Sequence, residues 1–357
     1  MLKNMFKIII LLILLNFVHG QNKGKPKNNG KIYQTNITNF YDQSYTIKVS
    51  IGTPPQFFDV LLSTGNADFW VTAFNVSTNK PRFFPQNSST FSLPTPQKYL
   101  NFPSVQGIVG VDTVQFAGLS QAKLEFSFAD IIENQTLAHP FDGIMGLTFP
   151  ELSKSATKTR LWLLLIIVKL LKQKMFTLYF KGGYGSEQKN MPGGLATFGG
   201  FDKENCGKKL GSVKFSGGVQ YQFPIDSISS QGNVFSNTTQ AVSDSSTSVI
   251  FGNINVTDQI AKQFGAVWND HDELYKIDCN ANASLTFRIG SVDYTMTKDV
   301  LIFGTNSSAC ALAIIPMDFE GYEWVLGSPF IRKFCHTYDI GKNQLTLSQV
   351  LNNEVCE

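Results

Sequence analysis

Two short segments place polar residues in the same setting, where a carboxylate or a hydroxyl group could do chemistry. They read LLSTGNADFWV at residues 61–71 and AVSDSSTSVIF at residues 241–251. In each, apolar residues lead to a small polar or acidic residue, Ser63 or Asp244, which is followed by two small residues and then Asn or Thr. An apolar-apolar-Gly element ends 83 residues after Ser63 and again 83 residues after Asp244. The matching spacing predicts two lobes of one ancestral fold that face each other across a cleft.

Other catalytic chemistries find little support in the residue pattern. The histidines are scattered without an HExxH motif, and no paired CxxC motif indicates zinc. The glycine-rich residues 182–194 lack the lysine placement of a phosphate-binding loop, so a surface hairpin is predicted there. We therefore expect no metal ion and no cofactor. The four histidines are His19, His139, His271 and His336.

The elements that must position Ser63 and Asp244 are predicted to be β-strands. Short alternating runs such as YTIKVSI, SLTFRIG and NQLTLSQV are separated by Gly, Pro, Asn and Ser turns, without long helical periodicity. One helix is predicted at residues 257–266, with Thr257 as its N-cap and Gly265 as its terminator. The pattern is typical of an all-β protein.

Length and charge narrow the class further. The chain has 357 residues, of which 43% are hydrophobic and 16% charged, which fits about two domains with substantial cores. Its 30 Phe and 11 Tyr are too much apolar surface for a disordered chain. The formal net charge is +3, but the first 40 residues hold six cations and no acids, so the remainder is net acidic. A mildly acidic domain lacks the excess of basic residues that binds nucleic acid, so no nucleic-acid partner is expected.

The N-terminus has the features of a cleaved signal peptide at residues 1–20. Lys3 and Lys7 precede an apolar run that is too short to span a bilayer, and Gly20 then leads into polar sequence. Eight N-x-S/T sequons fit a secreted surface, although an Asn-rich genome would produce some of them by chance. We predict a secreted, extracellular glycoprotein, with a lysosomal location as the alternative. The sequon asparagines are Asn36, Asn75, Asn87, Asn134, Asn237, Asn255, Asn282 and Asn306.

A second apolar run, LWLLLIIVKLL at residues 161–171, is interrupted by Lys169 and is also short for a membrane span. A buried helix is predicted there, so no membrane span is expected. A misplaced splice junction in the gene would also produce such a monotonous run. The correctness of this segment is left open, and with it the hypothesis that the chain is a pseudogene-like product.

The repeated segments resemble the active-site segments of the pepsin-like aspartic proteases. IGTPPQFFDVLLSTGNADFWV is similar to the family's first active-site segment, and QGIVGVDTV is similar to the strand that leaves its flap. FDGIMGL and WVLGSPFIRKF resemble its two apolar-apolar-Gly elements. The resemblance runs from about Tyr41 to Leu347. It implies a bilobal fold with two pseudo-twofold-related β lobes, here at residues 41–205 and 206–357, and an interlobe cleft.

The cysteines indicate which disulfides form in an oxidising compartment and which branch of the family the chain resembles. Five is an odd number, so in an oxidising compartment at least one cysteine is unpaired or pairs between chains. Cys279 and Cys310 bracket a hairpin-like stretch and match the family's disulfide in the C-terminal lobe. NCG at residues 205–207 and FC at 334–335 resemble a pattern of nematode members that implies a second disulfide. The residues whose pairing stays open are Cys206, Cys335 and Cys356.

The family's mechanism requires two carboxylates at the pseudo-twofold axis, which share one proton and hold a water molecule. One carboxylate acts as general base on the water while its protonated partner polarises the scissile carbonyl. By resemblance, the first catalytic position falls on Ser63 and the second on Asp244. A hydroxyl group can hydrogen-bond the water but cannot take its proton. A positioned acid-base group contributes roughly 10²–10⁴-fold in rate, so most activity should be lost.

Further positions also depart from the family. Ser246 replaces a glycine of the second motif, so its side chain is expected to crowd or hydrogen-bond Asp244. Thr64 and Ser245 keep the hydroxyl groups that brace the two loops in the family. The family's flap motif Tyr-Gly-Thr-Gly falls on residues 100–103, where Pro103 removes an N–H, and Tyr99 stands one position early. The cleft residues expected by resemblance are Thr64, Gly65, Tyr99, Ser245 and Ser246.

No other acid is expected to replace the missing carboxylate. Asp59 and Asp68 are predicted to be solvated strand or loop residues. Asp112 and Asp142 match non-catalytic family positions, so structural roles are predicted for both.

These observations leave open whether the chain is an enzyme. The first hypothesis is a secreted aspartic-protease homologue that has lost catalysis and keeps its cleft for a peptide or a protein partner. The second is a weakly active acid endopeptidase in which Asp244 works with Ser63 and water. Residues 21–40 are predicted to be a basic linker or the remnant of a propeptide, and a monomer is expected.

Overall fold

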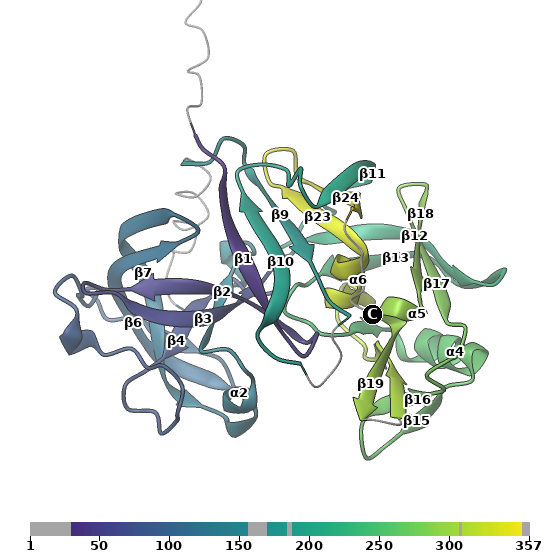
Figure 1. Ribbon diagram of the computed structural model, residues 1–357, viewed down its shortest axis with the longest axis horizontal. Helices are drawn as coiled ribbons and strands as arrows, with labels where there is room; N and C mark the ends of the chain where they lie inside the picture. Colours follow the sequence, from purple (N-terminus) through teal and green to yellow (C-terminus); the bar gives the residue numbers. More distant parts are fainter. Residues whose placement is uncertain (1–29, 156–169, 184–187, 307–308, 352–357) are drawn as a thin grey trace, which may run out of the picture. The chain divides into compact units, whose positions relative to one another are not determined.

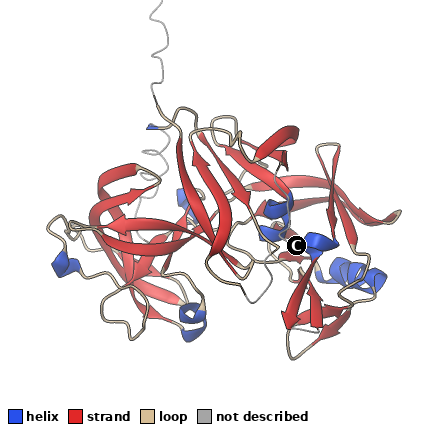
Figure 2. Ribbon diagram, in the orientation of Figure 1, coloured by secondary structure: helices blue, strands red, loops and turns tan. Residues whose placement is uncertain are grey.

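A computed structural model of the chain describes residues 30–155, 170–183, 188–306 and 309–351 (Figure 1). The chain divides into two units, Met1–Gly30 and Lys31–Glu357, and the helices and strands described below belong to the second. Strands dominate that unit, which confirms the all-β prediction (Figure 2). The predicted signal peptide, most of the predicted helix at 161–171, and Cys356 lie outside the described residues.

The strands up to residue 198 are β1 (Tyr33–Phe40), β2 (Ser44–Ile51), β3 (Gln56–Ser63), β4 (Phe69–Thr72), β5 (Tyr99–Asn101), β6 (Val105–Phe116), β7 (Leu119–Ile132), β8 (Gly143–Gly146), β9 (Met175–Phe180) and β10 (Met191–Phe198). The later strands are β11 (Cys206–Lys214), β12 (Gln222–Ser230), β13 (Asn233–Ser243), β14 (Ile250–Gly252), β15 (Val267–Asn269), β16 (Leu274–Ile277), β17 (Ser284–Ile289), β18 (Val292–Thr297), β19 (Ile302–Asn306), β20 (Ala309–Leu312), β21 (Ile314–Pro316), β22 (Trp324–Leu326), β23 (Phe334–Asp339) and β24 (Gln344–Val350). The described helices are η1 (Pro85–Asn87), α2 (Asn134–Ala138), η2 (Pro150–Leu152), α4 (Ile254–Phe264), α5 (Lys298–Leu301) and α6 (Ser328–Lys333).

The internal repeat of the sequence is a repeat of strand pairing. In the first half β3 runs parallel to β8, β8 runs antiparallel to β4, and β4 runs parallel to β7. In the second half β13, β22, β14 and β21 repeat the same three pairings in the same order. Each polar segment therefore leaves a strand that is flanked by its own apolar-apolar-Gly element, and the fold is bilobal as predicted.

Strands from both halves join in one sheet between the lobes. A 13-stranded sheet has the order β11-β24-β23-β9-β10-β1-β2-β3-β8-β4-β7-β6-β5, in which β23 from the second half pairs with β9 from the first. Strand β1 pairs with β10 and β2, so residues 33–40, which fall within the predicted linker, form a strand of this sheet. β9 and β10 are antiparallel neighbours, so the glycine-rich residues 182–194 cover the hairpin connection and the first residues of β10, and 184–187 lie outside the described residues.

The predicted helix is present with a shifted start. α4 begins at Ile254 because the side chain of Asn253 accepts hydrogen bonds from the N–H groups of Asn255 and Val256, so Asn253 rather than Thr257 is the N-cap. Thr257 is buried inside the helix. Gly265 ends the helix in the left-handed conformation (φ 74°), as predicted.

Two disulfides fasten the second half. Cys279 and Cys310 are joined, as predicted, with their Cα atoms 5.2 Å apart. Cys206 and Cys335 form the second disulfide, with a Cα–Cα distance of 5.9 Å, and it links β11 to β23. Among the helices in the described ranges, none is both long and apolar enough to cross a membrane.

Candidate functional site

The two repeated segments meet in a set of reciprocal hydrogen bonds between the lobes. The hydroxyl of Thr64 donates to the carbonyl oxygen of Ser243 at 2.9 Å, and the hydroxyl of Ser245 donates to the carbonyl oxygen of Leu62 at 2.7 Å. Each hydroxyl also accepts from the backbone N–H of the other residue, at 2.9 and 3.0 Å. Both side chains are buried, so these bonds fix the two loops against each other without competition from water.

The side chains at the two candidate catalytic positions are joined through a third residue. Ser63, which is fully buried, donates its hydroxyl to Ser246 Oγ at 2.8 Å and accepts from Asn66 Nδ2 at 2.9 Å. Ser246 Oγ donates in turn to Asp244 Oδ1 at 2.7 Å. The result is a hydrogen-bonded chain from Asn66 through Ser63 and Ser246 to Asp244.

Four donors surround the carboxylate of Asp244. Oδ1 accepts from the N–H of Gly65 at 3.1 Å and from both the N–H and the hydroxyl of Ser246, at 2.9 and 2.7 Å. Oδ2 accepts from the hydroxyl of Thr247 at 3.0 Å. A carboxylate has about four lone-pair sites, so these bonds occupy most of its capacity. Asp244 is therefore held as an acceptor by donors from both loops.

A buried polar group lies directly below the loops. Ser243 Oγ is 2.8 Å from Tyr338 Oη and 3.0 Å from His336 Nδ1, and all three residues are fully buried. Burial lowers the pKa of His336 to about 3, because the charged imidazolium loses its hydration. His336 is therefore a neutral part of the support for the second loop, and its burial keeps it away from any ligand.

A pocket of about 340 Å³ with both polar and apolar walls opens beside this hydrogen-bonded chain. Asn66 and Ser246 contribute polar groups to it from the two halves of the chain. Its other polar lining residues are Gln43, Ser44, Ser104, Thr136, His139 and Ser248. Its apolar walls are Leu61, Trp70, Phe102, Val105, Phe141 and Ile144. Lining residues from both halves make this pocket part of a cleft between the lobes.

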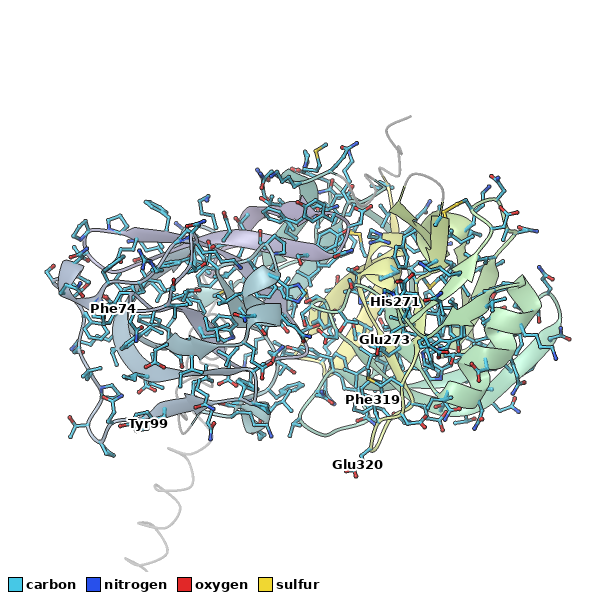
Figure 3. The ribbon with its side chains drawn as sticks, turned by 90° about the horizontal axis from the view of Figure 1, so that it is seen from below. Phe74, Tyr99, His271, Glu273, Phe319 and Glu320 are labelled. Carbon is cyan, nitrogen blue, oxygen red and sulfur yellow. A yellow bond between two sulfur atoms is a disulfide. The ribbon has the colours of Figure 1, made fainter. Side chains whose placement is uncertain are left out.

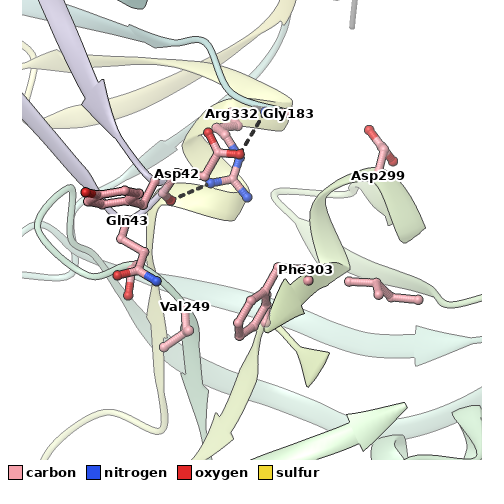
Figure 4. A pocket seen from close by; sticks show the side chains of 12 residues that line it. Asp42, Gln43, Gly183, Val249, Asp299, Phe303 and Arg332 are labelled. Carbon is pink, nitrogen blue, oxygen red and sulfur yellow. Dashed lines mark hydrogen bonds between the residues drawn. The ribbon is translucent and has the colours of Figure 1, made fainter. Parts of the chain in front are cut away.

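A second pocket of about 280 Å³ shares Gln43 and Ser248 with the first, so the two are neighbours along the cleft. Figure 4 shows its charged side. Arg332 donates to the carbonyl oxygen of Asp42 at 3.0 Å, and the carboxylate of Asp42 accepts from the N–H of Gly183 at 3.0 Å. Both charged side chains are thus hydrogen-bonded to backbone groups of the pocket wall.

The flap differs from the arrangement that the resemblance implies. Tyr99 is 59% exposed and lies at the outer margin of this half of the chain (Figure 3), so it does not line either pocket. Leu100, only 1% exposed, packs with Leu61 and Trp70 in a small apolar cluster, and Phe102 reaches the pocket instead. Alternation along a strand explains the difference, because neighbours of an inward residue point outward.

Two carboxylates away from the candidate catalytic positions, Asp68 and Asp142, are buried. Asp68, expected to be solvated, is 1% exposed, and it accepts from the Ser153 hydroxyl and the Lys154 N–H, both at 3.0 Å. Asp142 accepts from the N–H of Asp59 at 2.8 Å, and burial raises the pKa of Asp142 to about 6. The expectation for Asp68 is wrong, because the loop at 153–155 folds over it.

The arrangement of titratable groups limits the possible chemistry. Within the part of the chain that the structure describes, no three His, Cys, Asp or Glu side chains are grouped to hold a metal ion. The site has one carboxylate, Asp244, and at the equivalent position a buried hydroxyl. It can bind and orient a ligand through hydrogen bonds and apolar contacts, but it has no second carboxylate to share a proton.

Comparison with known proteins identifies the family. A model of the eukaryotic aspartyl protease family matches residues 44–350. The chain belongs to this family. It is 32% identical over 323 residues to aspartic protease 6 of Caenorhabditis elegans. The matched region covers 87% of this chain and 82% of that protein. Pepsin A of Rhinolophus ferrumequinum is 31% identical over 333 residues, with 88% and 83% covered. The matched region includes both Ser63 and Asp244.

Proposed function

We propose that this chain is a non-catalytic member of the eukaryotic aspartyl protease family that binds an extended peptide, or a peptide segment of a protein, in its interlobe cleft. The observation that carries the proposal is the chain of hydrogen bonds from Ser63 through Ser246 to Asp244. A serine hydroxyl cannot serve as the acid-base partner of a carboxylate at acidic pH. The braced loops and a pocket with a large apolar wall between them support a binding role.

The pocket suggests the kind of ligand. Aromatic and aliphatic walls formed by Trp70, Phe102, Phe141 and Ile144 suit a bulky apolar side chain of a peptide. Asp244 is already surrounded by donors, so a cationic side chain of the ligand is not expected to be selected by it. We therefore propose a peptide anchored by an apolar residue and held by polar contacts with its backbone.

Catalysis is tested first with the purified protein and a mixed library of denatured peptides between pH 2 and pH 7. We expect no new peptide termini. Cleavage that is blocked by a transition-state-mimicking inhibitor and lost in Asp244→Ala would instead establish the weakly active acid endopeptidase.

Binding is tested with the same library by retention on the immobilised protein. Ile144→Trp fills the apolar pocket and should weaken binding of the retained peptides at least tenfold. Ile131→Trp is the matched control, because Ile131 is 60% exposed and does not line the pocket. Equal binding by wild type and Ile144→Trp would place the ligand elsewhere.

We also propose that the protein is a secreted, monomeric glycoprotein, with a lysosomal location as the alternative. Two disulfides support an oxidising compartment. Seven of the eight sequon asparagines have exposed side chains, and that of Asn306 lies outside the described residues. Expression in a eukaryotic host, followed by glycosidase treatment and sedimentation of the protein from the medium, tests all three statements.

A further inference from the structure

Gly65 and Ser246 occupy equivalent positions of the two repeated segments, and each faces the other segment's key residue. Gly65 follows Ser63 by two positions, as Ser246 follows Asp244. The N–H of Gly65 contacts Asp244 Oδ1 at 3.1 Å, and the hydroxyl of Ser246 contacts that of Ser63 at 2.8 Å. The strand pairings repeat in the same order in both halves, so positions 65 and 246 are structural counterparts.

The surroundings of Gly65 show how much space a carboxylate opposite it requires. A Cβ atom built on Gly65 would lie 2.2 Å from Asp244 Oδ2 and 2.4 Å from its Cγ. Both distances are far inside van der Waals contact. The backbone fixes the position of a Cβ atom, and four hydrogen bonds hold the carboxylate of Asp244, so a side chain at position 65 would have to displace that carboxylate from its donors.

Ser246 carries the Cβ atom that this geometry forbids opposite a carboxylate. A Cβ atom at position 65 would overlap the carboxylate of Asp244. Because the two halves repeat, the Cβ atom of Ser246 would overlap a carboxylate at position 63 in the same way. We infer that Ser246 fills the space of the missing carboxylate, so that two residues, not one, exclude the catalytic dyad. The inference rests on the proposed loss of catalysis and assigns Ser246 as a positioning residue for residues 63 and 244.

A double-mutant cycle tests the inference. Ser63→Asp alone should lower the melting temperature by roughly 5 °C or more, because the new side chain overlaps Ser246. The double variant Ser63→Asp/Ser246→Gly should recover most of that loss, within about 2 °C of Ser246→Gly alone. It should also gain acid peptidase activity at least about 10²-fold above Ser63→Asp.

A neutral version of the cycle separates shape from charge and guards against a misfolded first variant. Ser63→Asn has the shape of the aspartate variant without its charge, and Ser246→Gly should rescue its melting temperature in the same way. Ser248→Gly is the matched control: Ser248 lies in the same loop but makes no hydrogen bond to Ser63, so it should rescue neither variant.

The outcomes separate this inference from the proposed function. Melting temperatures that change additively in both cycles, or a Ser63→Asp variant as stable as wild type, would overturn the role of Ser246. Peptide cleavage by the wild-type protein that is lost in Asp244→Ala would overturn the proposed function, whatever the cycles show.

Discussion

At the scale of single residues, the site keeps the contacts that hold the loops together and lacks one group that does chemistry. Thr64 and Ser245 make the full reciprocal set of hydrogen bonds between the lobes. Ser63 and Ser246 occupy the positions that correspond, by resemblance, to an Asp and a Gly of the family. The hydrogen bonds that support the site are therefore complete, while the first candidate catalytic position carries a hydroxyl group in place of a carboxylate.

Thr64→Val should be strongly destabilising because it removes the hydroxyl and keeps the shape of the side chain. The carbonyl of Ser243 and the N–H of Ser245 would each lose a buried partner, at a cost of about 2–4 kcal/mol in the free energy of unfolding. Urea denaturation measures the change. Thr295→Val, on an exposed strand position, should stay within about 0.5 kcal/mol of wild type. Similar losses in both variants would contradict the bracing role.

At the scale of elements, the flap hairpin is fastened at its edge strand. Leu100 of β5 forms an isolated antiparallel bridge with Ser155, and the loop that carries Ser155 is held by Asp68. Leu100 also packs in the apolar cluster beneath the hairpin. A flap held by backbone pairing and by burial should open less readily than a hairpin with a free edge.

Asp68→Asn should loosen this attachment, because an amide nitrogen replaces one of the two acceptor oxygens. Amide hydrogen exchange at residues 99–101 and 153–155 should become about tenfold faster or more, since one lost buried hydrogen bond is worth roughly 1.4 kcal/mol. Exchange in the central pairing of β6 with β7 should not change. Asp59→Asn, which removes a surface ion pair with Lys48 and no contact of the 153–155 loop, is the control. Unchanged exchange at β5 in Asp68→Asn would show that Asp68 does not hold the flap.

Much of this arrangement can be predicted from the sequence, because strand patterns, the internal repeat and one disulfide are local or symmetric signals. The contacts that were missed are long-range. Asp68 is buried by a loop 86 residues away, and Tyr99 and Leu100 exchange roles because strand alternation cannot be assigned from a motif alignment alone. The N-cap of α4 was misplaced because Asn253 and Thr257 are both good capping residues, and only the backbone geometry decides between them.

At the scale of the whole molecule, two buried titratable groups act on stability in opposite directions. The pKa of Asp142 is raised from 3.8 to about 6, so the folded state binds more protons than the unfolded chain between these values, and stability falls as the pH rises through them. The pKa of His336 is lowered from 6.5 to about 3, so stability falls as the pH drops through that range. The two effects offset each other between about pH 4 and pH 6, and only the loss from His336 continues below.

Asp142→Asn should therefore change the pH profile with a defined sign. The variant should be about 1–2 kcal/mol more stable than wild type at pH 7, where the wild-type carboxylate is charged and partly screened by solvent, and equal to it near pH 4. The amide oxygen can still accept from the N–H of Asp59. Urea denaturation at pH 4, 5, 6 and 7 measures both profiles, with the exposed Asp293→Asn as control. A difference that does not grow with pH would contradict the raised pKa.

The contact between Ser63 and Ser246 also orders the history of the site. An ancestor with Asp at position 63 and Gly at position 246 reaches this chain by two substitutions. On the inference that Ser246 excludes a carboxylate at position 63, the serine at 246 did not come first, and loss of the carboxylate preceded it. With both changes made, Asp cannot return at position 63 until Gly has returned at position 246, a step that by itself restores no carboxylate, so two ordered substitutions separate this chain from a catalytic dyad.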